Sequence, residues 1–123
     1  MKYFVANWKA NKNIDEIRHW LEEFSKGYKE NENVIVIIAP PFPFLQEIVG
    51  IAKNLKNVKV AAQDLSSFEE GSYTGEVTVK SLQGLVDYAI VGHSERRKYF
   101  NENDEIIEKK IDLANKYQIK TIL

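Results

Sequence analysis

The feature that most constrains the fold of this chain is a regular alternation of short apolar runs with longer amphipathic segments. The clearest run, Val34–Ala39, is continuously apolar rather than alternating. Such a run is expected for a strand of a parallel sheet that is covered on both faces. New runs begin roughly every 24–32 residues, as the βα pattern requires. The sequence therefore predicts an α/β chain of four βα units with parallel strands, followed by the start of a fifth strand.

The expected elements follow from local signals. Asn13 is a predicted N-cap, and Glu16 completes a capping box that opens the first helix. Asn103, followed by two acids, predicts the start of the last helix. The expected strands are 3–6, 34–39, 58–62, 88–91 and 120–123, and helices are expected after Asn13, after Pro43, around 79–86 and after Asn103.

Composition excludes several classes of function. The 123 residues suffice for one domain with a core, and the net charge of −1 gives no electrostatic reason to expect nucleic acid or an anionic membrane as a partner. The absence of cysteine excludes a zinc–thiolate site, and no cluster of metal ligands is evident. No secretory signal or run of about 20 apolar residues is present. We therefore expect a cytoplasmic protein without a metal or cofactor.

Polar residues gather where the predicted strands end. Asn7–Lys12 follows the first strand, Gln63–Asp64 the third, and His93–Arg97 the fourth. Parallel α/β folds place ligand sites at the carboxyl ends of their strands. Ser94 and Glu95 can open a helical turn, whose positive end disfavours a protonated imidazole at His93.

Three segments together resemble the triosephosphate isomerase family. They are Asn7-Trp8-Lys9, the Gln63-Asp64 to Tyr73-Thr74-Gly75-Glu76 region, and Gly92-His93-Ser94-Glu95-Arg96-Arg97. The resemblance implies a TIM (β/α)8 barrel, which needs about 250 residues. Residues 1–123 would then be a single half-barrel unit, the first half of that barrel. A doubly wound open sheet is a second arrangement that four βα units allow.

The resemblance also implies roles for individual residues. Lys9 would hold the substrate phosphate and offset negative charge on the enediolate, and Asn7 would help to position the substrate. His93 would be the neutral electrophile at the carbonyl, and Glu95 a second carboxylate hydrogen-bonded near Lys9. The family's glutamate base and closing lid would lie beyond Leu123. We therefore expect the isolated chain to be inactive and to need a C-terminal half to interconvert triose phosphates.

The loop that ends in Thr74, Gly75 and Glu76 carries a further implication of the resemblance. In the family, this loop reaches into the active site of a neighbouring subunit, so we expect a homo- or hetero-oligomer. A non-enzymatic alternative remains, in which the half-barrel is a self-associating scaffold or phosphate-binding module. Self-association would cover the open edges of the first and fifth strands.

Charged side chains outside these segments have simpler expected roles. Arg96 and Arg97 are expected to pair with acids such as Glu69, Glu70 or Glu76 and to brace the loop, and binding of an anion is the alternative role. Lys109 and Lys110 are expected to form a solvated helix face, and His19 is expected at the surface. Asn101 stands where the family usually has glycine, and asparagine tolerates the left-handed conformation that such a position requires.

Overall fold

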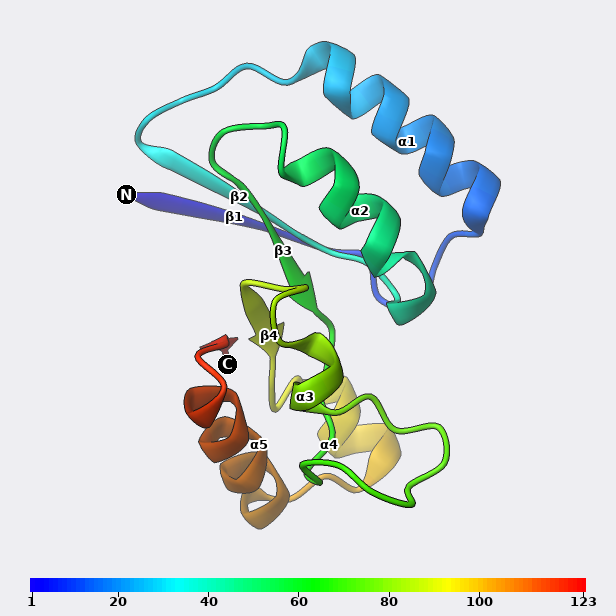
Figure 1. Cartoon of the computed structure of the whole chain (residues 1–123), viewed down its shortest axis with the longest axis vertical. Coiled ribbons are helices and arrows are strands. Elements are labelled where there is room, and N and C mark those ends of the chain that lie inside the picture. Colours follow the sequence, from blue (N-terminus) through cyan, green and yellow to red (C-terminus); the bar gives the residue numbers. More distant parts are fainter. The chain divides into compact units, whose positions relative to one another are not determined.

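The computed structural model describes all residues 1–123. Strands and helices alternate along the chain, and the chain divides into two compact units, Met1–Ala61 and Ala62–Leu123 (Figure 1). The strand pairs β1–β2, β2–β3 and β4–β5 are all parallel. This confirms the predicted fold class, the first half of a TIM barrel with four βα units and a fifth strand. That residues 1–123 act as a single unit stays a prediction.

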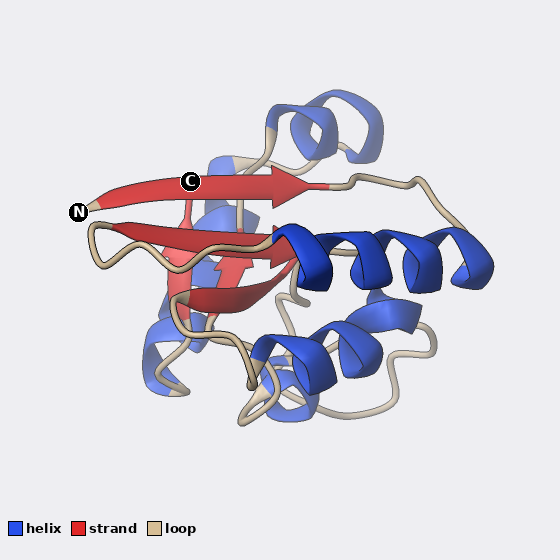
Figure 2. Ribbon diagram, turned by 90° about the horizontal axis from the view of Figure 1, so that it is seen from above, coloured by secondary structure: helices blue, strands red, loops and turns tan.

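The unit Met1–Ala61 is built from three strands and two helices. The register of β1 and β2 runs from Lys2 opposite Val34 to Asn7 opposite Ala39, so both strands end at the same level. Helices α1 and α2 lie side by side (Figure 2). The elements are β1 (Lys2–Asn7), α1 (Ile14–Gly27), β2 (Val34–Ala39), the 3-10 turn η1 (Phe42–Phe44), α2 (Leu45–Ala52) and β3 (Val58–Ala62).

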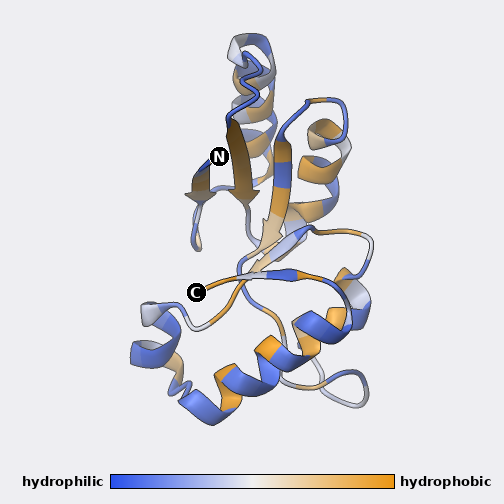
Figure 3. Cartoon of the chain, turned by 90° about the vertical axis from the view of Figure 1, so that its left-hand side faces the viewer, coloured by the Kyte–Doolittle hydropathy of each residue, from blue (hydrophilic) through white to orange (hydrophobic).

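Helix α1 begins as the sequence predicts. The Asn13 side chain accepts the N–H of Glu16, and the Glu16 side chain accepts the N–H of Asn13, which completes the capping box. Ile17 and Leu21 form its buried stripe, and Figure 3 shows hydrophobic and hydrophilic residues interleaved along the helix. Because one face is apolar, burial against neighbouring elements orients α1.

Strand β1 differs from the other strands in its exposure. Tyr3, Phe4 and Val5 are 56%, 61% and 42% exposed, whereas Ile37 and Ile38 of β2 are 1% exposed. β1 stands first in the strand order, at the edge of the sheet. An edge strand with exposed large apolar side chains is a surface on which another strand can pair.

The unit Ala62–Leu123 carries the remaining helices and strands. Helix α3 is shorter than the predicted 79–86 segment, since Gly84 turns the chain with a φ of +79°. Asn101, at a φ of +53°, ends α4 in the left-handed conformation expected of it. The elements are α3 (Val79–Leu82), β4 (Tyr88–Ile90), α4 (Ser94–Phe100), α5 (Asp104–Lys116) and β5 (Lys120–Ile122). None of the helices combines the length and apolar character needed to cross a membrane.

Candidate active site

The carboxyl end of β1 holds two predicted site residues, Asn7 and Lys9. Asn7 is the last residue of the strand, and its Oδ1 accepts the backbone N–H of Lys9 at 3.0 Å. Lys9 has a φ of +56°, a left-handed conformation that is uncommon outside glycine and asparagine. The Asn7 side chain therefore helps to fix a turn with a strained residue at the end of the strand, where ligand sites of this fold class lie.

Trp8 anchors this turn to the core of its unit. Its side chain is buried, and its N–H donates to the Ala39 carbonyl at 3.1 Å. The ring meets Trp20 of α1 edge-on, with centroids 4.8 Å apart. Asn11 donates to the Trp8 carbonyl at 2.9 Å. These contacts hold the backbone on both sides of Lys9, while the Lys9 side chain reaches solvent.

His93 stands where the chain leaves β4 and enters α4. Gly92 precedes it with a φ of +74°, and a Cβ added there would lie 3.3 Å from the Ile107 Cδ1. This close approach and the positive φ both favour glycine. His93 is the N-cap of α4, as the sequence predicts for a helical turn opened by Ser94 and Glu95.

The hydrogen bond of the imidazole defines its tautomer. The Glu95 N–H donates to His93 Nδ1 at 3.2 Å, so Nδ1 carries no proton. A neutral ring then holds its proton on Nε2, which can donate to a substrate oxygen. The Glu95 Oε2 lies 3.7 Å from the same nitrogen and would form an ion pair only with a protonated ring.

Glu95 lies in the first turn of α4, with its side chain 44% exposed. Asn7 and Lys9 belong to the unit Met1–Ala61, and His93 and Glu95 belong to the unit Ala62–Leu123. The hydrogen bond expected between Glu95 and Lys9 stays a prediction.

The loop of Thr74, Gly75 and Glu76 is exposed but ordered by its own contacts. Gly75 has a φ of +92°, and the Glu76 N–H donates to the Tyr73 carbonyl at 3.0 Å. The Ser66 hydroxyl donates to the Glu76 carboxylate at 3.1 Å. Phe68 and Tyr73 stack at the surface, with ring centroids 3.8 Å apart. The loop is thus preformed and presents aromatic surface to solvent.

The expected braces of this loop are wrong. Glu69 accepts hydrogen bonds from Lys116 and Tyr117 of the α5 end, each at 2.6 Å, and these bonds hold the pKa of Glu69 below its usual value. Glu70 pairs with Lys80 at 2.8 Å. Arg96 and Arg97 pair with other acids instead, none of them in this loop.

Arg97 pairs with Asp104 at 2.7 Å, on the surface. Arg96 joins a set of four charged residues that we call the buried charge cluster, which comprises Asp64, Arg96, Glu102 and Lys110. The Arg96 Nε lies 2.7 Å from Glu102 Oε2 and 3.1 Å from Asp64 Oδ2. The Lys110 Nζ lies 2.7 Å from Asp64 Oδ1 and 3.0 Å from Glu102 Oε2. Two cations and two carboxylates therefore alternate and balance.

Lys110 is the clearest correction to the sequence analysis. The sequence predicts it on a solvated face, but it is 4% exposed. The missed signal is its spacing, because Lys110 lies three residues after Ile107 and four before Ala114, and both of these are buried. A lysine on such a stripe needs an acidic partner, and here Asp64 and Glu102 supply it. His19, in contrast, is exposed on α1 as expected.

The pKa values of the two carboxyl groups in the cluster shift in opposite directions. Burial raises the pKa of Asp64, and Lys110 and Arg96 offset this only in part. Burial also acts to raise the pKa of Glu102, but hydrogen bonds from Arg96 and Lys110 outweigh it and lower the pKa. The difference follows the hydrogen bonds, since Glu102 accepts from both Arg96 and Lys110 whereas Asp64 accepts from Lys110 alone.

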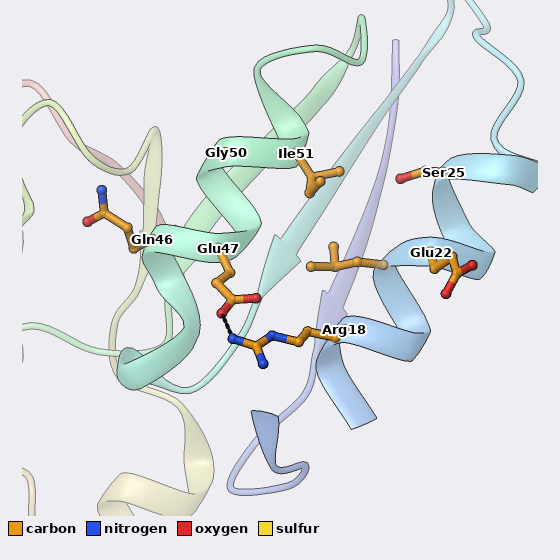
Figure 4. A pocket seen from close by; sticks show the side chains of 8 residues that line it. Arg18, Glu22, Ser25, Gln46, Glu47, Gly50 and Ile51 are labelled. Atoms are coloured by element: carbon orange, nitrogen blue, oxygen red, sulfur yellow. Dashed lines mark hydrogen bonds and ion pairs between the residues drawn. The ribbon is translucent and has the colours of Figure 1, made fainter. Parts of the chain in front are cut away.

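A separate groove lies between α1 and α2, with a volume of about 360 Å³ (Figure 4). Leu21 and Ile51 contribute apolar surface, and Arg18 and Glu47 pair across it at 3.2 Å. It contains none of the predicted site residues. No group of three or more histidine, cysteine, aspartate or glutamate residues in the structure is arranged to hold a metal ion.

Comparison with known proteins decides the family. The model of the triosephosphate isomerase family matches residues 2–123. The chain belongs to the triosephosphate isomerase family. Membership favours the (β/α)8 half-barrel over the doubly wound sheet, because a triosephosphate isomerase domain is a TIM barrel.

Individual triosephosphate isomerases support the same assignment. That of Mesomycoplasma hyopneumoniae (strain 232) is 42% identical over 125 residues, covering 96% of this chain and 50% of the relative. That of Acetivibrio thermocellus is 43% identical over 120 residues, covering 97% and 47%. That of Treponema denticola is 39% identical over 122 residues, covering 98% and 48%. The chain thus spans about half the length of these triosephosphate isomerases.

Proposed function

We propose that residues 1–123 form the N-terminal half of a triosephosphate isomerase, which interconverts dihydroxyacetone phosphate and glyceraldehyde 3-phosphate in glycolysis and gluconeogenesis in the cytoplasm. The observation that carries the proposal is the hydrogen bond from the Glu95 N–H to His93 Nδ1. It leaves Nε2–H of a neutral ring as a donor at the end of a parallel strand. A neutral donor of this kind can stabilise an oxyanion without first being ionised.

The roles of the site residues follow the family's known mechanism. A glutamate base supplied by the C-terminal half removes a proton from the substrate carbon beside the carbonyl. As the electron pair moves to oxygen, His93 Nε2–H donates to that oxygen and stabilises the enediolate. Lys9 offsets the negative charge and holds the phosphate, Asn7 positions the substrate, and Glu95 stays close to Lys9. His93 carries the hydroxyl proton from the neighbouring oxygen to the former carbonyl oxygen, and return of the abstracted proton to the former carbonyl carbon completes the isomerisation.

This function depends on a C-terminal half, whether joined to these residues or separate from them. The base, the lid and the remaining strands of the barrel come from that half. The exposed apolar side chains of β1, Tyr3, Phe4 and Val5, support a need for a further strand at this edge. The ordered, exposed loop at Thr74, Gly75 and Glu76 supports docking against a neighbouring subunit's Asn7, which makes the working enzyme an oligomer.

The test is a kinetic assay of triose phosphate interconversion. The chain alone should be inactive, and adding the complementary C-terminal half should produce activity. In that assembly, His93→Gln should lower kcat on the order of 10²–10³-fold, with a smaller effect on KM. His19→Gln is the matched control, since His19 is exposed on α1. Full activity of the chain alone, or an unchanged kcat in His93→Gln, would contradict the proposal.

The exposed edge of β1 also favours a second candidate, a self-associating half-barrel scaffold without catalysis. In that case, two copies would close one barrel of eight strands, to which each copy contributes its four βα units. Light scattering on the pure chain distinguishes the two. A stable, soluble two-copy particle that does not exchange with the C-terminal half would favour the scaffold, whereas aggregation of the pure chain would favour dependence on the C-terminal half.

A further inference from the structure

The helix that begins at His93 has an unusual means of attachment. Helix α4 contains no buried residue, so apolar packing of its own side chains does not fix its orientation. Its link to buried side chains is Arg96, which contacts Asp64 and Glu102 in the buried charge cluster. A short helix without an apolar face is free to tilt unless such polar contacts hold it.

The cluster ties three other segments to this helix. Asp64 follows β3, Glu102 lies in the connection after α4, and Lys110 lies on α5. Glu102 also donates its backbone N–H to the Arg96 carbonyl at 3.3 Å. Arg96 is therefore held at both its side chain and its carbonyl, and the acids that hold it are themselves held by Lys110.

Arg96 is in turn one turn of helix away from His93. The Arg96 N–H donates to the His93 carbonyl at 2.9 Å, and the Glu95 N–H between them donates to His93 Nδ1 at 3.2 Å. Any rotation of the first turn of α4 would move the Glu95 N–H away from the imidazole. The ring would then lose the contact that selects its Nε2–H tautomer.

The burial of the cluster argues that it does more than stabilise the fold. The side chains of Glu102 and Lys110 are 3% and 5% exposed. Buried ion pairs contribute little net stability compared with apolar residues of similar volume, whereas their geometry is demanding. Fixed geometry is what a donor aimed at a substrate oxygen requires.

We propose that Glu102 and Lys110 are positioning residues for the isomerase reaction, which act through Arg96 to hold α4 and thereby the Nε2–H tautomer and orientation of His93. The proposal rests on the proposed function for its catalytic consequence. Its structural part concerns the state of the His93 ring and stands on this chain alone. Neither residue touches the substrate.

The structural part is tested by NMR of the chain with ¹⁵N-labelled histidine. The sequence has two histidines, and exposed His19 serves as an internal reference. Glu102→Gln keeps the shape of the side chain and an oxygen that can accept, but it removes the charge that Arg96 and Lys110 share. In this variant, the His93 signals should shift from the Nε2–H tautomer towards a mixture of the two, while the His19 signals stay in place.

Arg97→Gln is the matched control. Arg97 neighbours Arg96 on the same helix, but it pairs with Asp104, whose side chain is 91% exposed. This control should leave the signals of both histidines unchanged. If Glu102→Gln does not fold, Glu102→Asp takes its place, because it keeps the charge but shortens the side chain that reaches Arg96 and Lys110; the His93 signals should shift in the same direction. Unchanged His93 signals in a folded variant, or failure of both variants to fold, would overturn the proposal and leave the cluster a purely structural role.

The catalytic part is measured in the barrel assembled with the C-terminal half. Glu102→Gln should lower kcat on the order of 10–100-fold with little change in KM, since a small misplacement of a catalytic group has effects of this size. Arg97→Gln should leave kcat unchanged. If the assembly of unsubstituted halves shows no isomerase activity, the proposed function fails, whereas the tautomer measurement still decides the positioning role. An unchanged kcat in a folded, active Glu102→Gln assembly would overturn it.

Discussion

Replacement of Lys110 by methionine should destabilise the protein far more than the same replacement at its neighbour Lys109. Lys110 Nζ lies 2.7 Å from Asp64 Oδ1 and 3.0 Å from Glu102 Oε2, and the residue is 4% exposed. Methionine keeps most of the side-chain volume but removes the charge. Two buried carboxylates would then face Arg96 alone. Loss of one partner from a buried ion pair costs about 3–5 kcal/mol.

Urea denaturation measures this difference directly. With a slope of about 2 kcal/mol per molar urea, a loss of about 4 kcal/mol lowers the midpoint by about 2 M. Lys109 pairs with Glu105 at 3.5 Å on an exposed helix face, where both side chains are at least 60% exposed. Lys109→Met should therefore change the free energy of unfolding by no more than about 0.5 kcal/mol.

A second substitution checks the cause. Adding Asp64→Asn to Lys110→Met restores the balance of one cation, Arg96, with one carboxylate, Glu102. The double variant should recover part of the lost stability, with a coupling energy of about 0.5–3 kcal/mol. Equal midpoints for Lys110→Met and Lys109→Met would refute the reasoning, because the buried pairs would then contribute nothing. Additive effects in the double variant would refute the role assigned to charge imbalance.

Three further predictions concern other elements. Gly92→Ala should cost about 1–3 kcal/mol in thermal or urea unfolding because of its φ of +74°, whereas Gly50→Ala in α2, where the added Cβ meets nothing within 4 Å, should stabilise by roughly 0.5–1 kcal/mol. Asn13→Ala should destabilise by about 1 kcal/mol and lower helicity in circular dichroism, since it removes the side-chain oxygen that accepts the Glu16 N–H; an unchanged melting curve would contradict this. Because its hydrogen bonds lower the pKa of Glu69, the stabilising contact with Lys116 is present above the ordinary value of 4.5 and is lost as pH falls through the lowered value. Limited proteolysis should therefore cut the loop faster below that range, and Glu69→Gln should remove the pH dependence of the cutting rate.

Local signals in the sequence predict local structure well in this chain. The Asn13 capping box, the left-handed Asn101 and the helix start at Asn103 all appear in the structure. Each depends on residues only a few positions apart, so the sequence contains the whole interaction. The C-terminal end of α3 is harder to predict from the sequence, because Leu85 and Val86 continue the apolar spacing while Gly84 turns the backbone.

The contacts of charged side chains could not be predicted in the same way. The sequence offers many acids as partners for Arg96 and Lys110. Asp64, which pairs with both, is distant from them in the sequence, so no local pattern identifies it. Once Lys110 is recognised on the stripe of Ile107 and Ala114, its burial follows, but the identity of its partner does not. The same distinction holds for the candidate site. Motif spacing predicts that His93 lies at a helix start. It does not predict that Nδ1 accepts the Glu95 N–H, because this depends on the orientation of the ring.

The sequence separations within the buried charge cluster have a consequence for folding kinetics. Arg96 and Glu102 are 6 residues apart, whereas Asp64 and Lys110 are 46 residues apart. The longer connection cannot form until the loop between β3 and α5 has closed, which carries an entropic cost. We therefore expect the full cluster to assemble after the folding transition state. Interactions absent from that state slow unfolding rather than speed folding, so the cluster should lengthen the native lifetime of the segment that carries His93.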